Sequence, residues 1–154
     1  MTNKVIIRSA ETRDIAAVLP LMHKLAEFEG YRHQFKVTAS SLRTIIEQNN
    51  DTGIVVADSA DAIVGYLAYY YLPFTYDLSP WLVIKELFVC ANARNRGVGQ
   101  ALFAQARHLC ASKGGHKIKW EVLTQNHNAQ RFYQRCGAQL EDEWRIMSLR
   151  VPPA

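Results

Sequence analysis

The chain has 154 residues, of which 49% are hydrophobic and 21% are charged, and these proportions exclude intrinsic disorder and fibrous repeats. The formal net charge of +4 suits an anionic ligand but is too small for a typical nucleic-acid-binding face. The longest apolar stretch, residues 63–74, is interrupted by Gly65 and Pro73 and is too short to cross a membrane.

The first third of the chain predicts one strand and two helices. Residues 4–8 are short and β-branched, as is typical of a strand. Thr12 is expected to cap a helix in which Pro20 causes a bend. A second helix is expected at about residues 39–48. The apolar residues of the first helix recur at helical spacing: Ile15, Val18, Leu19, Met22, Leu25 and Ala26.

The remainder of the chain alternates predicted strands with predicted helices. Strands are expected at 54–58, 62–72, 81–89 and 117–123, and two last strands at 139–140 and 144–151. A helix should begin near Val98, and a short helix should end at Gly137. Because the central strands follow one another like hairpins, the pattern predicts a mixed α/β sheet in one domain, residues 4–151.

Cysteine usage and the start of the chain favour the cytoplasm. The three cysteines Cys90, Cys110 and Cys136 lie far apart among apolar neighbours, which is typical of reduced thiols. Residues 5–7 are too short an apolar run for a signal peptide. No His, Cys or acidic pair has the spacing of metal ligands, so no metal is expected.

Residues 94–100, with the sequence Arg-Asn-Arg-Gly-Val-Gly-Gln, lie between a predicted strand and a predicted helix. The first N–H groups of a helix are unpaired and favour an anion, and glycines allow a diphosphate to approach the main chain. The segment matches neither a nucleoside-triphosphate loop nor a dinucleotide fingerprint. A glycine-rich helix start without a ligand is the alternative.

A second segment follows the strand predicted at 117–123. Asn126 stands near a helix start, and Tyr133 lies within that helix, before Gly137. Taken alone, Tyr133 is more typical of a core aromatic residue than of a catalyst.

In this order the two segments resemble the Gcn5-related N-acetyltransferase (GNAT) family. The first fits the family's pattern of Arg or Gln, two residues, Gly, one residue, and Gly or Ala; the second fits its next motif through Asn126, Ala129, Phe132-Tyr133 and Gly137-Ala138. Segments 25–29, 69–71, 74–77 and 131–138, with Trp81, resemble the diamine (spermidine/spermine) acetyltransferase branch. The resemblance implies a mixed, mostly antiparallel sheet flanked by helices, with two strands splayed at an acetyl-coenzyme A site.

The resemblance also implies which residues hold acetyl-coenzyme A, the expected cosubstrate. The pantetheine arm would pair with the strand at Leu87, and the diphosphate would lie on the amides of 95–100. The full set implied is Leu87, Phe88, Val89, Arg94, Asn95, Arg96, Gly97, Val98, Gly99, Gln100, Asn126, His127, Asn128 and Tyr133.

The expected reaction is direct attack of a primary amine on the thioester through a tetrahedral intermediate. An alkylammonium group must first lose a proton, and Glu86 is the first candidate for the base, although a surface or ion-paired strand residue remains the alternative. By resemblance, a main-chain N–H near Phe88 or Val89 would stabilise the oxyanion and Tyr133 would protonate the thiolate.

The expected acceptor residues are Phe28, Glu29, Lys85 and Glu86. Lys85 stands where the diamine branch has a glutamate, so a carboxylate-bearing or less charged amine is favoured over spermidine, with Lys85 or Arg32 as the carboxylate's partner. The alternatives are a protein or peptide N-acetyltransferase and an inactive coenzyme-binding regulatory module. The resemblance also implies a homodimer; neither nucleic acid nor membrane is expected as a partner.

Overall fold

The computed structural model describes residues 4–48 and 51–154. The chain divides into two compact units, one ending at Glu121 and the other beginning at Val122. The first unit contains the sheet and three helices, and the second contains one helix and the C-terminal segment. The prediction of a single domain over residues 4–151 stays a prediction.

The first unit is built on a five-stranded sheet in the order β1-β2-β3-β4-β5. The first four strands pair antiparallel, and β4 and β5 pair parallel. This is the mixed, mostly antiparallel sheet that the sequence predicts. The strands are β1 (Ile6–Ser9), β2 (Thr52–Asp58), β3 (Ile63–Leu72), β4 (Trp81–Val89) and β5 (Lys117–Trp120).

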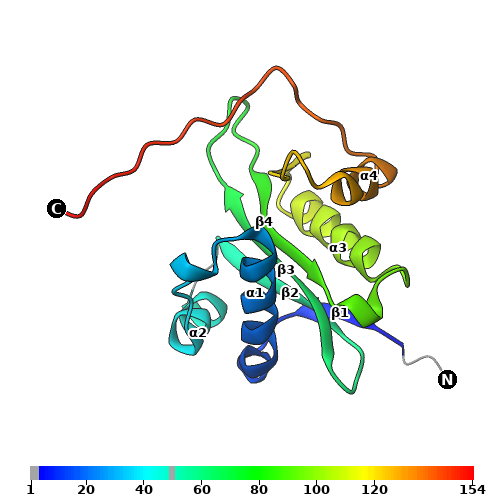
Figure 1. Ribbon diagram of the computed structural model, residues 1–154. Helices are drawn as coiled ribbons and strands as arrows, with labels where there is room; N and C mark the ends of the chain where they lie inside the picture. The colour runs from blue at the N-terminus through cyan, green and yellow to red at the C-terminus, as the bar shows by residue number, and fades with distance from the viewer. Residues whose placement is uncertain (1–3, 49–50) are drawn as a thin grey trace. The chain divides into compact units, whose positions relative to one another are not determined.

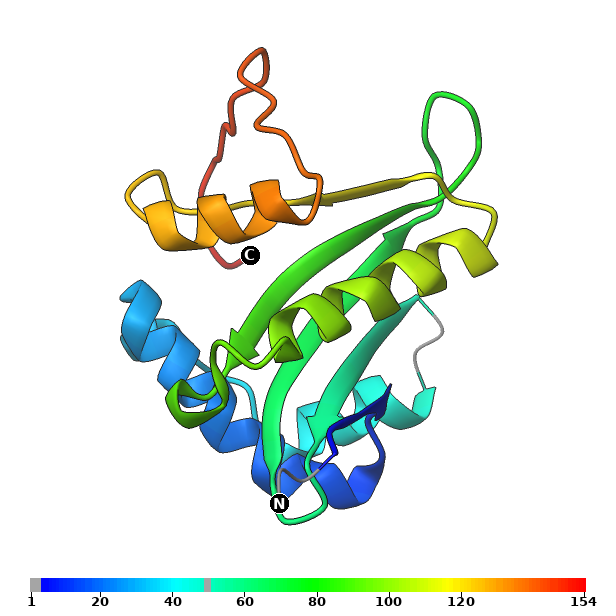
Figure 2. The same cartoon turned by 90° about the vertical axis from the view of Figure 1, so that its right-hand side faces the viewer.

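Helices cover both faces of this sheet (Figures 1 and 2). Helices α1 (Ile15–Glu29) and α2 (Ala39–Gln48) lie on one face, and α3 (Val98–Ser112) lies on the other. Because successive side chains of a strand point to opposite faces of the sheet, the core has one part on each face. Tyr66 of β3 packs in the cluster formed by α1, whereas a Cβ at Gly65 would lie 3.4 Å from Leu102 of α3. Both Tyr66 and Leu102 are fully buried.

Helix α1 begins two residues later than predicted, with its N-cap at Asp14 instead of Thr12, because Thr12–Asp14 forms a 3₁₀ turn. Asp14, not Thr12, organises this start. Its carboxylate accepts the N–H of Glu11 at 2.7 Å and two bonds from the Arg8 guanidinium, at 2.7 and 2.9 Å. Arg8 also donates to Asp58 of β2, so one buried ion cluster joins β1, β2 and the helix start.

The helix continues through Pro20, whose side chain is exposed. The carbonyl that loses its N–H partner there can therefore be solvated. Leu21 is buried in α1, whereas Leu19, predicted for the apolar stripe, is only half-buried. The other predicted positions of that stripe are buried.

Strand β4 departs from regular pairing on both of its sides. Towards β3, Ala68 pairs with Glu86 and the next residue, Tyr69, pairs with Ile84, so Lys85 is the extra residue of a β-bulge. Towards β5, pairing extends only from Trp81 to Ile84. From Lys85 to Val89, β3 is the only strand partner of β4 in the described sheet. This is the predicted splayed pair, and Figure 2 shows β5 diverging from β4.

The second unit contains α4 (His127–Arg135), which ends before Gly137 as predicted. The strands predicted at 139–140 and 144–151 are wrong, since no residue from 138 to 154 is in a strand. The alternating apolar pattern forms a strand only where another strand supplies hydrogen-bond partners. Without one, Trp144, Ile146 and Met147 are 76%, 71% and 93% exposed. Strand β5 likewise ends at Trp120, before the predicted residue 123.

Within the described residues no helix has the length and apolar character to cross a membrane. The three cysteines are free thiols. The same residues contain no cluster of three His, Cys, Asp or Glu that could hold a metal ion. The cytoplasmic location and the homodimer stay predictions.

The Arg8 cluster makes a testable contribution to stability. The Arg8 hydrogen bonds lower the pKa of Asp14 despite its burial, so this contribution is present above the carboxylate's unfolded pKa and is lost as the pH falls. We expect Arg8→Met to lower the free energy of unfolding at pH 7 by about 3 kcal/mol, since it leaves a buried charge unpaired. Urea unfolding should show a smaller difference at pH 3.

Arg13→Met is the matched control, because the ion pair of Arg13 with Glu11 is largely exposed. We expect Arg13→Met to lower the free energy of unfolding by less than about 1 kcal/mol. An equal cost for the two arginine variants would contradict a structural role for the Arg8 cluster.

Candidate active site

The segment that joins β4 to α3 presents main-chain amides to solvent. After a short 3₁₀ turn, Asn95 and Gly97 both adopt left-handed backbone angles, with φ of 63° and 79°. Gly97 is the N-cap of α3, and a Cβ built on it would have no atom within 4 Å. The first N–H groups of a helix have no intrahelical partner, and the open space beside Gly97 leaves room for an anion at this helix start.

Two arginines flank these amides. Arg94 donates its Nε–H to the carbonyl of Val89 at 3.0 Å, which ties the loop to the last residue of β4. Arg96 is exposed. The two arginines predicted to neutralise phosphate charge therefore differ. Arg94 is held by its hydrogen bond to β4, whereas Arg96 extends into solvent beside the helix start.

The unpaired edge of β4 leads directly to this helix start. Leu87, Phe88 and Val89 are half-buried and lie where β4 has lost β5 as a neighbour. The structure therefore brings the predicted coenzyme residues from 87 to 100 together in the first unit. An extended, amide-bearing arm ending in a diphosphate fits this arrangement of a free strand edge followed by open helix amides.

A buried tyrosine binds the carboxylate that was predicted as the base. The phenol of Tyr66 donates to Oε2 of Glu86 at 2.8 Å. Glu86 is half-buried on the sheet face that α1 covers, next to Phe88, which packs on the same core. Sequence reasoning missed Tyr66. Only the pairing of the two strands shows this contact, because Tyr66 pairs with Phe88 and Glu86 pairs with Ala68, two positions further along β3.

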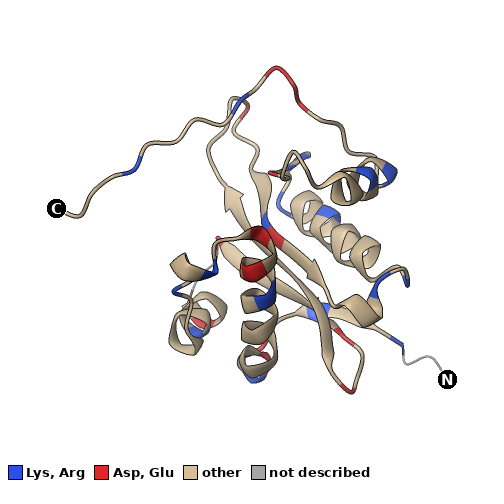
Figure 3. Cartoon of the chain, in the orientation of Figure 1, with Lys and Arg blue, Asp and Glu red and all other residues tan. Residues whose placement is uncertain are grey.

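Three charged residues act on one another beside this bond. Burial raises the pKa of Glu29, and the charge of Glu86 raises it further, whereas Lys85 opposes the shift. Tyr31, just beyond α1, has its pKa raised to about 12 by burial, by Glu86 and by Glu29. In Figure 3 the end of α1 is red where it meets adjacent blue and red segments of β4. The predicted residues Glu29, Lys85 and Glu86 therefore form one acceptor cluster.

Two other residues considered for the acceptor have different surroundings. Phe28 lies in the last turn of α1 and is 69% exposed. Arg32, considered as the partner of a substrate carboxylate, donates to Glu27 at 3.1 Å instead. Of the two cations predicted as partners of a substrate carboxylate, Lys85 is therefore the better placed, because Arg32 already binds Glu27.

The remaining predicted residues belong to the second unit and share α4. Asn126 is its N-cap, accepting the N–H of Ala129 at 3.1 Å, while Asn128 accepts from the side chain of Arg131. Tyr133 is half-buried, with its ring centroid 5.3 Å from that of Phe132, and His127 is exposed.

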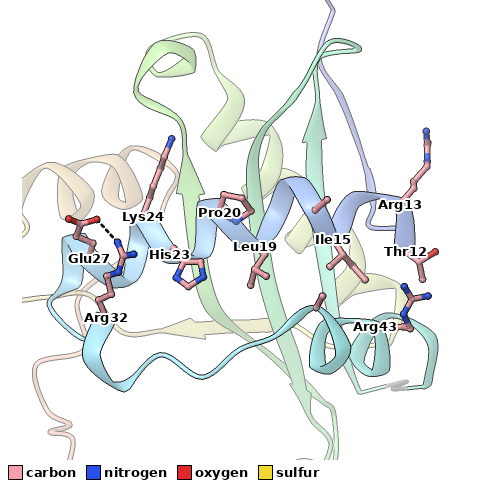
Figure 4. Close-up of a pocket in the computed structure, with 12 residues that line it drawn as sticks. Thr12, Arg13, Ile15, Leu19, Pro20, His23, Lys24, Glu27, Arg32 and Arg43 are labelled. Atoms are coloured by element: carbon pink, nitrogen blue, oxygen red, sulfur yellow. Dashed lines mark hydrogen bonds and ion pairs between the residues drawn. The ribbon is translucent and has the colours of Figure 1, made fainter.

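A separate cavity of about 790 Å³ lies between α1 and α2 (Figure 4). Of the residues considered for the coenzyme or the acceptor, Arg32 lines it, whereas Glu86 and residues 87–100 do not. Its three arginines, Arg13, Arg32 and Arg43, have nearby carboxylate partners.

Comparison with known proteins identifies the family. The model of the acetyltransferase (GNAT) family matches residues 19–138. An uncharacterized N-acetyltransferase YhfO of Bacillus subtilis is 24% identical over 146 residues, covering 95% of this chain and 97% of that protein. The thialysine N-epsilon-acetyltransferase of Mus musculus is 27% identical, covering 86% and 83%. An aminoglycoside acetyltransferase from a soil metagenome, crystallised with sisomicin, has a TM-score of 0.81 at 19% identity, covering 96% and 97%.

The chain therefore belongs to the acetyltransferase (GNAT) family and is an acyltransferase. Acetyltransferases of this family use acetyl-coenzyme A as cosubstrate. The open amides at the start of α3 and the free edge of β4 fit that molecule's diphosphate and its pantetheine arm.

The anion-binding role of the α3 start can be tested at Gly97. Asp and Asn are nearly isosteric, tolerate the left-handed region and favour an N-cap, so Gly97→Asp and Gly97→Asn should both fold. Only aspartate repels a diphosphate. We expect coenzyme A to bind Gly97→Asp at least about tenfold more weakly than Gly97→Asn, a difference of about 1.4 kcal/mol. Isothermal titration calorimetry measures it.

The difference between the two variants should narrow as salt is added, because screening weakens the repulsion. Equal affinities at low salt would show that the diphosphate does not lie at this helix start.

Proposed function

We propose that this GNAT acetyltransferase transfers the acetyl group of acetyl-coenzyme A to the side-chain amine of a small, amino-acid-like molecule. The observation that carries the proposal is the acceptor cluster: the carboxylates of Glu29 and Glu86 with the ammonium of Lys85 beside them. A diamine or polyamine is the second candidate, supported by the retained acid Glu29.

The charges of the acceptor cluster match such a molecule. Two carboxylates and one ammonium leave one negative charge in excess. An amino acid with a side-chain amine carries two ammonium groups and one carboxylate, so its charges are the complement of the cluster. A polyamine has several ammonium groups and no carboxylate, and Lys85 would repel it. The cluster therefore favours the amino-acid-like acceptor.

The similarity to relatives points in the same direction. The murine relative that matches most of this chain is named for acetylating the ε-nitrogen of thialysine, a lysine analogue with both a carboxylate and a side-chain amine. A substrate of that kind would place its carboxylate at Lys85 and its ammonium groups at Glu29 and Glu86. Lys85 is exposed and free to reorient towards a carboxylate.

In the proposed reaction, Glu86 removes the proton that makes the acceptor's alkylammonium group non-nucleophilic, directly or through one water. The amine then attacks the thioester carbonyl to give a tetrahedral intermediate. The N–H of Val89 stabilises its oxyanion, because it points away from β3 and this end of β4 has no partner on the β5 side. As the intermediate collapses, Tyr133 gives its proton to the departing thiolate and regains one from the acceptor nitrogen, which loses its second proton on becoming an amide; the proton held by Glu86 leaves to solvent.

The residues proposed to bind the coenzyme are those that the sequence predicts. The diphosphate is held by the amides of residues 95–100, with Arg96 nearby to neutralise charge. The pantetheine arm follows the edge of β4 at Leu87. Asn126, His127 and Asn128 contact that arm, and the amide nitrogen of Asn126 remains a donor after its oxygen has capped α4.

A competition among acceptors tests the proposal. We expect thiol release from acetyl-coenzyme A to be fastest with lysine, ornithine or thialysine, slower with spermidine, and slowest with short peptides. Lys85→Glu should raise kcat/KM for spermidine at least about tenfold and lower it for the amino acids, because the substitution replaces repulsion by attraction. Mass spectrometry of the products identifies the acetylated nitrogen.

Lys4→Glu makes the same charge change at the opposite edge of the sheet and should leave the acceptor preference unaltered. An unchanged preference in Lys85→Glu would show that the lysine does not face the acceptor. A clear preference for peptides in the wild-type enzyme would replace the small-molecule proposal by that of a peptide acetyltransferase.

The role proposed for Tyr133 requires its hydroxyl group but not its ring. Tyr133→Phe should lower kcat at least tenfold, since one well-aimed donor typically contributes about 2.7–4 kcal/mol to the barrier. Coenzyme A affinity should change little. Stopped assays of thiol release and calorimetric titration of the same preparation measure the two quantities. Near-normal turnover in Tyr133→Phe would remove this residue from the proposed mechanism.

A further inference from the structure

We infer that Tyr66 is a positioning residue for this reaction, one that aims the Glu86 carboxylate at the acceptor through a buried hydrogen bond. The inference rests on the proposed function, because it needs Glu86 to act as the base. It adds a residue of β3 to the acceptor cluster, whose other residues lie on α1 and β4.

Packing and a hydrogen bond fix Tyr66 and the Glu86 carboxylate relative to one another. Tyr66 is 0% exposed, and its ring packs in the core between β3 and α1, with its centroid 6.3 Å from that of Phe88. Its hydroxyl donates to Oε2 of Glu86 at 2.8 Å. Because the ring is locked by packing and both residues lie on paired strands, this bond fixes the direction of the carboxylate. The other oxygen, Oε1, remains available to accept a proton.

The surroundings of Tyr66 keep its phenol protonated. Burial and the neighbouring Glu86 raise the pKa of Tyr66 well above its usual range, so the phenol keeps its proton and remains a donor at any pH at which the enzyme works. A donor to a carboxylate stabilises the charged form over the acid form.

The groups that act on Glu86 come from every element beside it. Glu29 at the end of α1 and Tyr31 just after it are coupled to its charge, Tyr66 of β3 donates to it, and Lys85 precedes it on β4. Glu29 opposes the charged carboxylate, and Lys85, which acts on Glu29, is the nearby positive charge. Tyr66 is the group among the described residues with a direct hydrogen bond to Glu86.

The test is Tyr66→Phe, which keeps the buried ring and removes one oxygen. The substitution removes the donor that favours the charged form of a carboxylate over its acid form. We expect kcat/KM relative to wild type to fall at least fivefold at pH 6 but to stay within about twofold at pH 9. A residue needed only for packing would lower the rate equally at both pH values.

Tyr71→Phe is the matched control. Tyr71 lies on the same strand, and its hydroxyl donates to a backbone carbonyl, that of Leu109, at 3.1 Å. Its loss should affect stability and leave the pH profile of acetyl transfer as in wild type. Urea unfolding of both variants separates a loss of stability from a loss of base function.

A double-mutant cycle supplies a readout that a structural role would not produce. If Tyr66 acts through Glu86, then Tyr66→Phe should cost less than about twofold in kcat when Glu86→Gln is already present. Equal losses in the two backgrounds would overturn the inference, as would a Tyr66→Phe loss that does not depend on pH.

Carbon-13 NMR of the Glu86 carboxyl carbon tests the hydrogen bond without any acetyl transfer. We expect its protonation to occur at higher pH in Tyr66→Phe than in wild type, and unaltered behaviour would overturn the inference. If the wild-type enzyme released no thiol with any amine, the proposed function would fail on that result alone, while the NMR comparison would still decide whether Tyr66 controls the carboxylate.

Discussion

The described site depends on the place where β4 loses its parallel neighbour. Pairing with β5 ends at Ile84, yet β4 continues for five residues that only β3 holds. A strand with one unpaired edge is normally a liability, because its amides and carbonyls invite another chain. Here the free edge runs directly into the α3 start, so the same backbone discontinuity supplies both a template for an extended ligand and access to the helix amides.

The bulge at Lys85 lies directly after Ile84, where pairing with β5 ends, and it changes the direction of the side chains that follow on β4. An extra residue on one strand rotates the side chains that follow it. It puts Glu86 opposite Ala68 and within reach of Tyr66, on the sheet face covered by α1. In the proposed function, coenzyme and acceptor therefore use different parts of one strand, the edge for the first and the face for the second. Continued pairing with β5 would cover the edge that the coenzyme is proposed to use.

How far the sequence predicts this structure depends on whether the determining contacts are local. The bounds of β4 and α2, and the α3 start at Gly97, follow from periodicity and glycine placement, and the structure confirms them. The strand predicted over 144–151 shows the limit, because its pattern lacks the partner that a strand requires. The Tyr66–Glu86 bond was missed for a related reason. It depends on the β3–β4 register, which a bulge shifts by one residue, and no spacing within a single strand reveals that.

These observations suggest why the acceptor cluster can change specificity without disturbing the fold. Lys85 is exposed and is the extra residue of the bulge, so its side chain has no core neighbours to satisfy. Glu86, by contrast, is held by Tyr66, and altering it would leave a buried hydroxyl without its acceptor. Charge can therefore vary at Lys85 at little structural cost while the proposed base stays fixed. A lysine there, where the diamine branch has a glutamate, is the kind of change that redirects one scaffold from a polyamine to a zwitterionic amine.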